Sequence, residues 1–179
     1  RIVVVDSLAA TLGQGLLVYK AVQLKEAGKN LDEIAAWLEE NKYHLVHNFT
    51  VDDLFHLHRG GRLSKTAAIV GTMINLKPVL HVDDEGHLVM LSKVRGRKKS
   101  LIGLVDCMEK QLGDWKDKND IIFISHGDCE QDAQYVAAKV KEKYNIKTAF
   151  LIDEKDRKCG FLALLLSMYS EKKTIYIVR

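Results

Sequence analysis

The sequence predicts an α/β fold with some antiparallel sheet, on three observations. Short β-branched and apolar runs alternate with longer segments of helical period along the chain. The runs Ile2–Val5 and Ile121–Ile124 are uninterrupted, which is typical of strands covered on both faces. Two more apolar runs, Val79–Val82 and His87–Leu91, flank an acidic turn with glycine and predict a β-hairpin. Together these patterns favour helices packed on a sheet of mixed direction.

A helix is expected directly after the first strand. Ser7 or Thr11 could supply its side-chain cap. Its apolar residues repeat at three- to five-residue spacing and form one stripe: Leu12, Leu16, Tyr19 and Leu24. Asn30 and Glu33 resemble a capping box that opens a second helix. The alternating segment Tyr43–Phe49 then predicts a strand.

A glycine corner between two short helices follows that strand. Thr50 could cap the first helix, whose positive first turn suits the acids Asp52 and Asp53. Arg59-Gly60-Gly61-Arg62 breaks this helix, and Ser64 caps a second, apolar helix over Thr66–Leu76. The two glycines permit a positive φ, and the two arginines offer forked donors for a carboxylate or phosphate. An ordinary helix corner with solvated arginines explains the same pattern.

The second half of the chain continues the alternation. A basic segment at Lys93–Lys99 precedes a helix from Ser100 to Gly113. Asp128 could cap the next helix, which carries apolar residues as far as Tyr144. Ala149–Ile152 and Thr174–Val178 are further strand candidates.

Composition excludes several classes of protein. The 179 residues are 47% hydrophobic and 28% charged, which is typical of a soluble globular chain. A formal charge of +3 is too weak to indicate a nucleic-acid partner. The longest apolar run, Phe161–Met168, is too short to span a membrane, so stable membrane insertion is not expected. The cysteines Cys107, Cys129 and Cys159 lie far apart, which favours a reducing, cytoplasmic setting.

The strongest candidate for chemistry is Ser125-His126-Gly127-Asp128, which follows a predicted strand. The carboxyl ends of strands are where α/β folds bind ligands. Neighbours in sequence do not converge as a catalytic triad does, so nucleophilic catalysis is not favoured here. Two interpretations remain open: His126 contacts a ligand, or the segment is a strand-to-helix turn. The other histidines lack metal-ligand spacing and no phosphate-binding glycine motif is present, so neither a metal site nor a cofactor is expected.

Several long motifs together resemble the DegV family of bacterial fatty-acid-binding proteins. They are V-V-D-S-L-A-A-T-L-G-Q-G, F-T-V-D-D-L-F-H-L-H-R-G-G-R-L-S, I-N-L-K-P-V-L-H-V-D-D-E-G, K-V-R-G-R-K-K-S and S-H-G-D. They occur in the family's order between about Val3 and Asp153. Their joint occurrence is far more specific than any single glycine pattern.

The resemblance implies a two-domain architecture and a carrier function. A partial parallel-sheet domain would cover residues 1–50, and a domain with mixed or antiparallel sheet and helices would cover 51–179. Proteins of this family bind a long-chain fatty acid and present its carboxylate to an ATP-dependent fatty acid kinase subunit. They are not enzymes themselves. The implied partners are thus a fatty acid and a kinase, and no metal or further cofactor is implied.

The resemblance also implies two sets of site residues. Fatty-acid-binding positions would be Phe49, Leu54, Ile69 and Met73, with His126 as a substitute contact for the carboxylate. The kinase-docking surface would contain Arg59, Gly60, Gly61 and Arg62, and a second basic patch with Arg95 and Arg97.

Two departures from the family pattern leave alternatives open. The chain opens directly on a strand pattern, which suggests that the family's amino-terminal section, with its carboxylate-holding hydroxyls, is missing. The family's closing glycine- and proline-rich motif, with its histidine, is replaced by residues 153–160. The chain could therefore be a lipid-free interaction module or a truncated variant that keeps only the docking surface. A hydrolase that uses His126 is a third hypothesis.

Overall fold

The computed structural model describes residues 1–52, 54–61, 76–113, 119, 121–144, 146–153 and 163–169, the last of these by their backbone only. The described helices are α1 (Thr11–Glu26), α2 (Leu31–Asn41), α3 (Leu54–Arg59), α5 (Arg97–Leu112) and α6 (Glu130–Lys143), with a 3₁₀ turn, η1, at Lys42–His44. The described strands are β1 (Leu45–Val51), β2 (Leu76–Val82), β3 (Leu88–Arg95), β4 (Ile121–His126), β5 (Thr148–Asp153) and β6 (Ala163–Tyr169).

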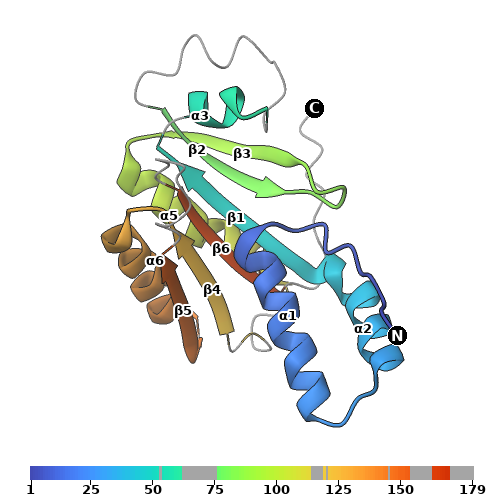
Figure 1. Cartoon of the computed structure of the whole chain (residues 1–179). Coiled ribbons are helices and arrows are strands. Elements are labelled where there is room, and N and C mark those ends of the chain that lie inside the picture. Colours follow the sequence, from blue (N-terminus) through green and yellow to red (C-terminus); the bar gives the residue numbers. More distant parts are fainter. Residues whose placement is uncertain are drawn as a thin grey trace.

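The described strands form one mixed six-stranded sheet in the order β3-β2-β1-β6-β4-β5 (Figure 1). Only β4 and β5 pair in parallel, and every other neighbouring pair is antiparallel. The predicted α/β class with mixed sheet is confirmed. The division into domains at residue 50 stays a prediction; strand β1, which spans that position, lies inside the sheet.

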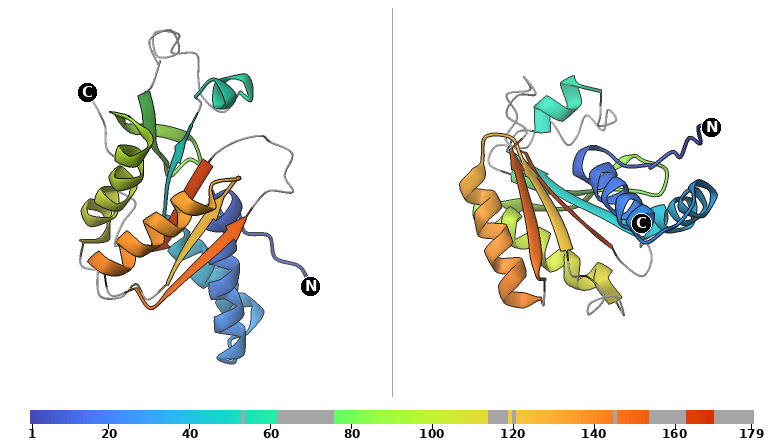
Figure 2. Two further views of the ribbon diagram at one scale, coloured as in Figure 1. Left: turned by 90° about the vertical axis from the view of Figure 1, so that its left-hand side faces the viewer. Right: turned by 60° about the horizontal axis from the view of Figure 1, so that its bottom comes forward.

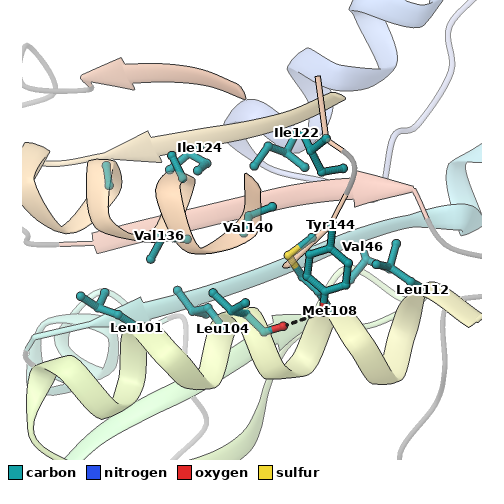
Figure 3. Close-up of a cluster of buried hydrophobic side chains, with 14 of the residues drawn as sticks. Val46, Leu101, Leu104, Met108, Leu112, Ile122, Ile124, Val136, Val140 and Tyr144 are labelled. Atoms are coloured by element: carbon teal, nitrogen blue, oxygen red, sulfur yellow. Dashed lines mark hydrogen bonds between the residues drawn. The ribbon is translucent and has the colours of Figure 1, made fainter. Parts of the chain in front are cut away.

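Helices cover both faces of the sheet (Figure 2). On one face, α5 and α6 close the largest apolar core with alternate residues of β1, β2 and β4 (Figure 3). Its fully buried members include Val79, Leu104, Met108, Ile122, Ile124, Val136 and Val140. The Tyr144 hydroxyl donates to the Val105 carbonyl oxygen at 3.2 Å and fastens the end of α6 to α5. On the other face, α1 packs on Leu45, Ile121 and Phe123, and α2 packs beside it.

Several local predictions are confirmed. Asn30 and Glu33 form the expected capping box of α2. Strands β2 and β3 form the expected hairpin, and Gly86 takes a φ of 84° in its turn. The helical periods predicted α1, α5 and α6, the buried run Ile121–Ile124 predicted β4, and the candidate Ala149–Ile152 predicted β5. Short-range patterns therefore identified most of the elements.

The predicted strand at Ile2–Val5 is wrong. Residues 1–10 contain no strand, and the side chains of Ile2 and Val4 are 89% and 86% exposed. A β-branched run favours extended backbone, but a strand also needs a neighbour for its hydrogen bonds. No described strand pairs with this run.

Three predicted side-chain caps are wrong, and a fourth, Ser64, lies outside the described residues. Ala10 is the N-cap of α1 and no side chain caps that helix, although Ser7 and Thr11 lie near. Cys129, not Asp128, is the N-cap of α6. Thr50 lies inside β1, where its hydroxyl donates to the Pro78 carbonyl oxygen at 2.7 Å. In each case the helix begins at a different residue from the one that the pattern indicated.

Strand β6 was not predicted. It lies between β1 and β4, antiparallel to both, and so completes the centre of the sheet. The sequence showed only an apolar run too short for a membrane span, and leucine does not favour strands as Val or Ile do. Of the predicted helix at 66–76, only Leu76 is described, and it begins β2; the predicted strand at 174–178 lies outside the described residues.

Candidate functional site

An apolar cluster under α3 contains two of the predicted fatty-acid-binding residues, Phe49 and Leu54. Phe49 lies on β1 and Leu54 opens α3, and both are buried. The cluster, which we call the α3 cluster, comprises Phe49, Val51, Leu54, Leu57, Leu80 and Val82. The other two predicted positions, Ile69 and Met73, lie outside the described residues.

The glycine corner closes α3 as predicted. The helix ends at Arg59, and Gly61 takes a φ of 70° while its N–H donates to the His58 carbonyl oxygen at 2.9 Å. A side chain at a positive φ is strained, so glycine suits this turn. Arg59, Gly60 and Gly61 are exposed. Arg62 lies outside the described residues.

The second basic patch contains two arginines in different environments. Arg95 is exposed at the end of β3. Arg97 begins α5, and its side chain is only 18% exposed. Its Nε donates to Oδ2 of Asp132 on α6 at 2.6 Å, and its Nη2 lies 3.7 Å from Cys129 Sγ. Arg97 therefore joins α5 to α6, whereas Arg95 faces solvent.

His126 is buried at the carboxyl end of β4, on the α5–α6 face of the sheet. Ile122 and Ile124 point into the α5–α6 core, and strand alternation places His126 on the same face. Its Nδ1 lies 3.6 Å from Oδ1 of Asp153, the opposite residue on β5. Phe49 is on the other face, so the structure does not bring His126 together with the α3 cluster.

Ser125 shares a face with Phe49. Phe49 is opposite Leu165 in the β1–β6 pair, and Leu165 is opposite Ser125 in the β6–β4 pair. Directly opposite residues point to the same face, so Phe49 and Ser125 belong to one row across the sheet. Ser125 is buried. From the sequence, this serine was a candidate only as a nucleophile. If the predicted strand had been extended through His126, strand alternation would have placed Ser125 on this face.

The amino-terminal end of α1 meets the same face beside the α3 cluster. Gly13 packs against the buried ring of His47, and Phe49 is two residues further along β1. The first turn of a helix has backbone N–H groups without partners in the helix, and such ends bind carboxylates. No side chain caps this end, and Thr11 Oγ1 is buried without a hydrogen-bond partner. Thr11 was predicted as a cap only, so this arrangement was missed.

An open groove lies elsewhere, between the amino-terminal segment, α1 and α2. Its volume is about 290 Å³, and its walls are mainly apolar. Its lining, which includes Val5, Leu17, Val18, Val22 and Leu38, shares no residue with the α3 cluster. Among the described residues there is no group of His, Cys, Asp and Glu that could hold a metal ion. Nor does any helix in the described part of the chain have the length and hydropathy of a membrane span.

Comparison with known proteins decides the family. A family model described as "Uncharacterised protein, DegV family" matches residues 1–160. The chain belongs to the DegV family. A DegV domain-containing protein of Clostridium perfringens is 51% identical over 150 residues, which are 84% of this chain and 50% of that protein. This chain thus spans about half the length of the curated DegV relatives that it matches.

Solved structures with a similar fold include the following two. A Thermus thermophilus DegV family protein, described by its fatty acid binding, has a TM-score of 0.78 at 29% identity, over 95% of this chain and 61% of that one. The Fatty Acid Kinase (Fak) B3 protein of Streptococcus pneumoniae, loaded with linoleic acid, has a TM-score of 0.82 at 23% identity. That match covers 94% of this chain and 60% of the other. The expected DegV resemblance and fold class are both confirmed.

Proposed function

We propose that this chain acts as a cytoplasmic, non-enzymatic fatty acid carrier. It would present the carboxylate of a long-chain fatty acid to a kinase subunit. The observation that carries the proposal is the α3 cluster beside the uncapped end of α1, in a chain of the DegV family. An apolar region next to the amino-terminal end of a helix matches the two ends of a fatty acid. The fatty acid binding of the Thermus relative supports this ligand class.

The acyl tail in this proposal enters the apolar region around Phe49 and Leu54. A carboxylate without partners in such a region would cost several kcal/mol. The amino-terminal end of α1 carries a positive partial charge, although its Gly13 N–H already donates to the Ala10 carbonyl oxygen at 3.0 Å. Thr11 adds a buried hydroxyl without a hydrogen-bond partner. His126, the contact expected from the sequence, lies on the opposite face of the sheet. We therefore assign the carboxylate to the α1 end, with Thr11 as its side-chain donor.

The kinase-docking surface in this proposal is the corner Arg59-Gly60-Gly61, at the solvent side of α3. This corner begins where the α3 cluster ends, so a bound partner would lie near the ligand region. Arg62, the second arginine of the motif, and the exposed Arg95 are proposed to add to the surface. Arg97 contributes by holding α5 and α6 together, because its guanidinium is bound to Asp132. The Fak B3 relative supports the choice of a kinase as partner.

Native mass spectrometry of the protein from a bacterial host tests the lipid claim. We expect a co-purified long-chain fatty acid, and we expect Thr11→Val to lower its occupancy several-fold. The exposed Thr148→Val, at the far edge of the sheet, removes a hydroxyl in the same way and should leave occupancy unchanged. His126→Ala should also retain the lipid. Protein without lipid that takes up neither oleate nor palmitate would refute the proposal.

A lipid-free interaction module is the second candidate. It is favoured by the burial of Phe49 and Leu54 against their own neighbours, and by the half-length match to the relatives. A pull-down with the kinase distinguishes the two functions. The module is favoured if delipidated protein captures the kinase at the same yield as loaded protein, and if Arg59→Ala abolishes capture by both. Capture that requires oleate would favour the carrier.

A further inference from the structure

Strand β5 forms an edge of the sheet with exposed apolar side chains. It is last in the strand order and, of the described strands, pairs only with β4. Phe150, Leu151 and Ile152 are 40%, 37% and 40% exposed. Because consecutive strand residues alternate between faces, this edge is apolar on both faces of the sheet. Natural edge strands usually carry charges, prolines or bulges that prevent pairing, and the apolar stretch of β5 has none of these.

We propose that β5 pairs antiparallel with β5 of a second copy of the chain, so that one sheet continues across a two-fold axis. A two-fold interface brings the same surface of both copies together, so the strand must be complementary to itself. Antiparallel pairing of one strand with its own copy satisfies this condition. The edge N–H and C=O groups of the two strands then become each other's partners.

The hydrogen-bond pattern limits the register of this pairing. In an antiparallel pair, opposite residues are either both hydrogen-bonded across the pair or both not. A strand that pairs with itself must therefore place each residue opposite one an even number of positions away. The axis then passes through a residue, which near the centre of β5 means Ala149, Phe150 or Leu151.

Charge complementarity selects one of these registers. With the axis through Phe150, Lys147 lies opposite Asp153 of the second copy, and symmetry repeats this opposite-charge pair at the other end. With the axis through Ala149, Lys147 would face Leu151. With the axis through Leu151, Asp153 would face Ala149. The Phe150 register is thus the one of the three that places opposite charges together.

The same register extends the apolar contacts on both faces. The Phe150 ring lies on the α1 face, with its centroid 5.1 Å from that of Phe123 and 6.1 Å from that of Tyr19. Pairing Phe150 with its symmetry mate joins the two aromatic groups across the axis. On the other face, Leu151 lies opposite Ala149 of the second copy. Asp153, whose side chain is 42% exposed beside His126, lies at the end of this edge.

Sedimentation equilibrium of the full chain, with charge-reversed variants, tests the proposal. We expect a reversible dimer. In the Lys147→Asp variant, an acid at position 147 lies opposite Asp153 of the second copy at both ends of the pairing. In the Asp153→Lys variant, two lysines lie opposite each other in the same way. Each variant should therefore raise the dissociation constant of the dimer about tenfold or more. A mixture of the two variants restores both opposite-charge pairs and should form a heterodimer. Lys98→Asp on α5 makes the same change of charge away from the edge and should leave the dimer intact.

Circular dichroism confirms that each variant is folded before it is compared. If Asp153→Lys does not fold, Leu151→Lys replaces it and should abolish the dimer, because it puts a charge in the centre of the pairing. A monomer at every soluble concentration would overturn the proposal. So would a dimer that neither variant weakens, or single variants that weaken the dimer while their mixture does not restore it. Neither Lys147 nor Asp153 belongs to the α3 cluster or the α1 end, so lipid occupancy reports on the fatty acid proposal independently.

Discussion

Replacing Gly13 with alanine is expected to destabilise the chain, although alanine is the better helix former. A Cβ at Gly13 would lie 1.3 Å from Cε1 of His47, far inside contact distance. His47 is 1% exposed on β1, so its ring has no solvent-facing position to which it can move. Either α1 must move away from the sheet or the ring must leave its place in the core.

The magnitude follows from two opposing contributions. Helix propensity favours alanine over glycine by at most about 1 kcal/mol. Inserting a methyl group into a filled site typically costs about 1–3 kcal/mol, and this overlap is more severe than that of most single-carbon insertions. The net loss should therefore be about 1–2 kcal/mol or more. Gly15→Ala is the matched control, because its Cβ would meet Leu12 Cδ2 at an ordinary 3.4 Å, and it should be neutral or stabilising.

Urea unfolding followed by circular dichroism measures both variants. The reasoning requires opposite signs for Gly13→Ala and Gly15→Ala. It also requires that His47→Ala and Gly13→Ala together cost less than the sum of the two single changes, because the smaller side chain makes room for the new methyl group. A Gly13→Ala variant as stable as the parent chain would refute the close contact between α1 and β1.

Three further predictions concern the α5–α6 face. Arg97→Ala should cost about 1–3 kcal/mol in urea unfolding, because the half-buried Asp132 loses its partner, whereas the exposed Arg95→Ala should change stability by less than about 0.5 kcal/mol. Gln111→Ala should cost about 1–3 kcal/mol, because the buried Asn48 loses its partner amide. Burial raises the pKa of the Tyr144 hydroxyl, so the folded chain keeps a proton that the unfolded chain releases above about pH 10. Stability should therefore be fully present below that pH and fall above it, and Tyr144→Phe should remove part of this fall.

Sequence patterns identified elements whose evidence is local. The hairpin β2–β3 has its turn residues between two apolar runs, and the capping box of α2 lies within four residues. The strand predicted at Ile2–Val5 failed for the opposite reason: its composition favours extended backbone, but a strand partner is a long-range property. Strand β6 was missed for a related reason. Its place between β1 and β4 depends on strands that are distant in sequence, so the apolar run alone did not predict it.

The roles of the candidate site residues stay predictions, but part of their placement in the fold was expected. Phe49 and Leu54 were expected together, and they share the α3 cluster because the end of β1 leads directly into α3. The corner at Arg59 was expected as a helix break, and Gly61 supplies it with a positive φ. The sequence did not distinguish Arg95 from Arg97, since their environments depend on Asp132, which is distant in the chain.

A polar residue can contact a ligand bound over the α3 cluster only if it lies on the same face of the sheet as that cluster. The tetrad that ends β4 placed Ser125 and His126 next to each other in sequence, and histidine was the more attractive candidate. Strand alternation places them on opposite faces. His126 shares the α5–α6 face with Ile122 and Ile124, and Ser125 shares the other face with Phe49. The α1 end reaches that second face through the Gly13–His47 contact. In the proposed carrier, a carboxylate over Phe49 would therefore lie on the α1 side of the sheet, whereas His126 would have to reach it through the sheet.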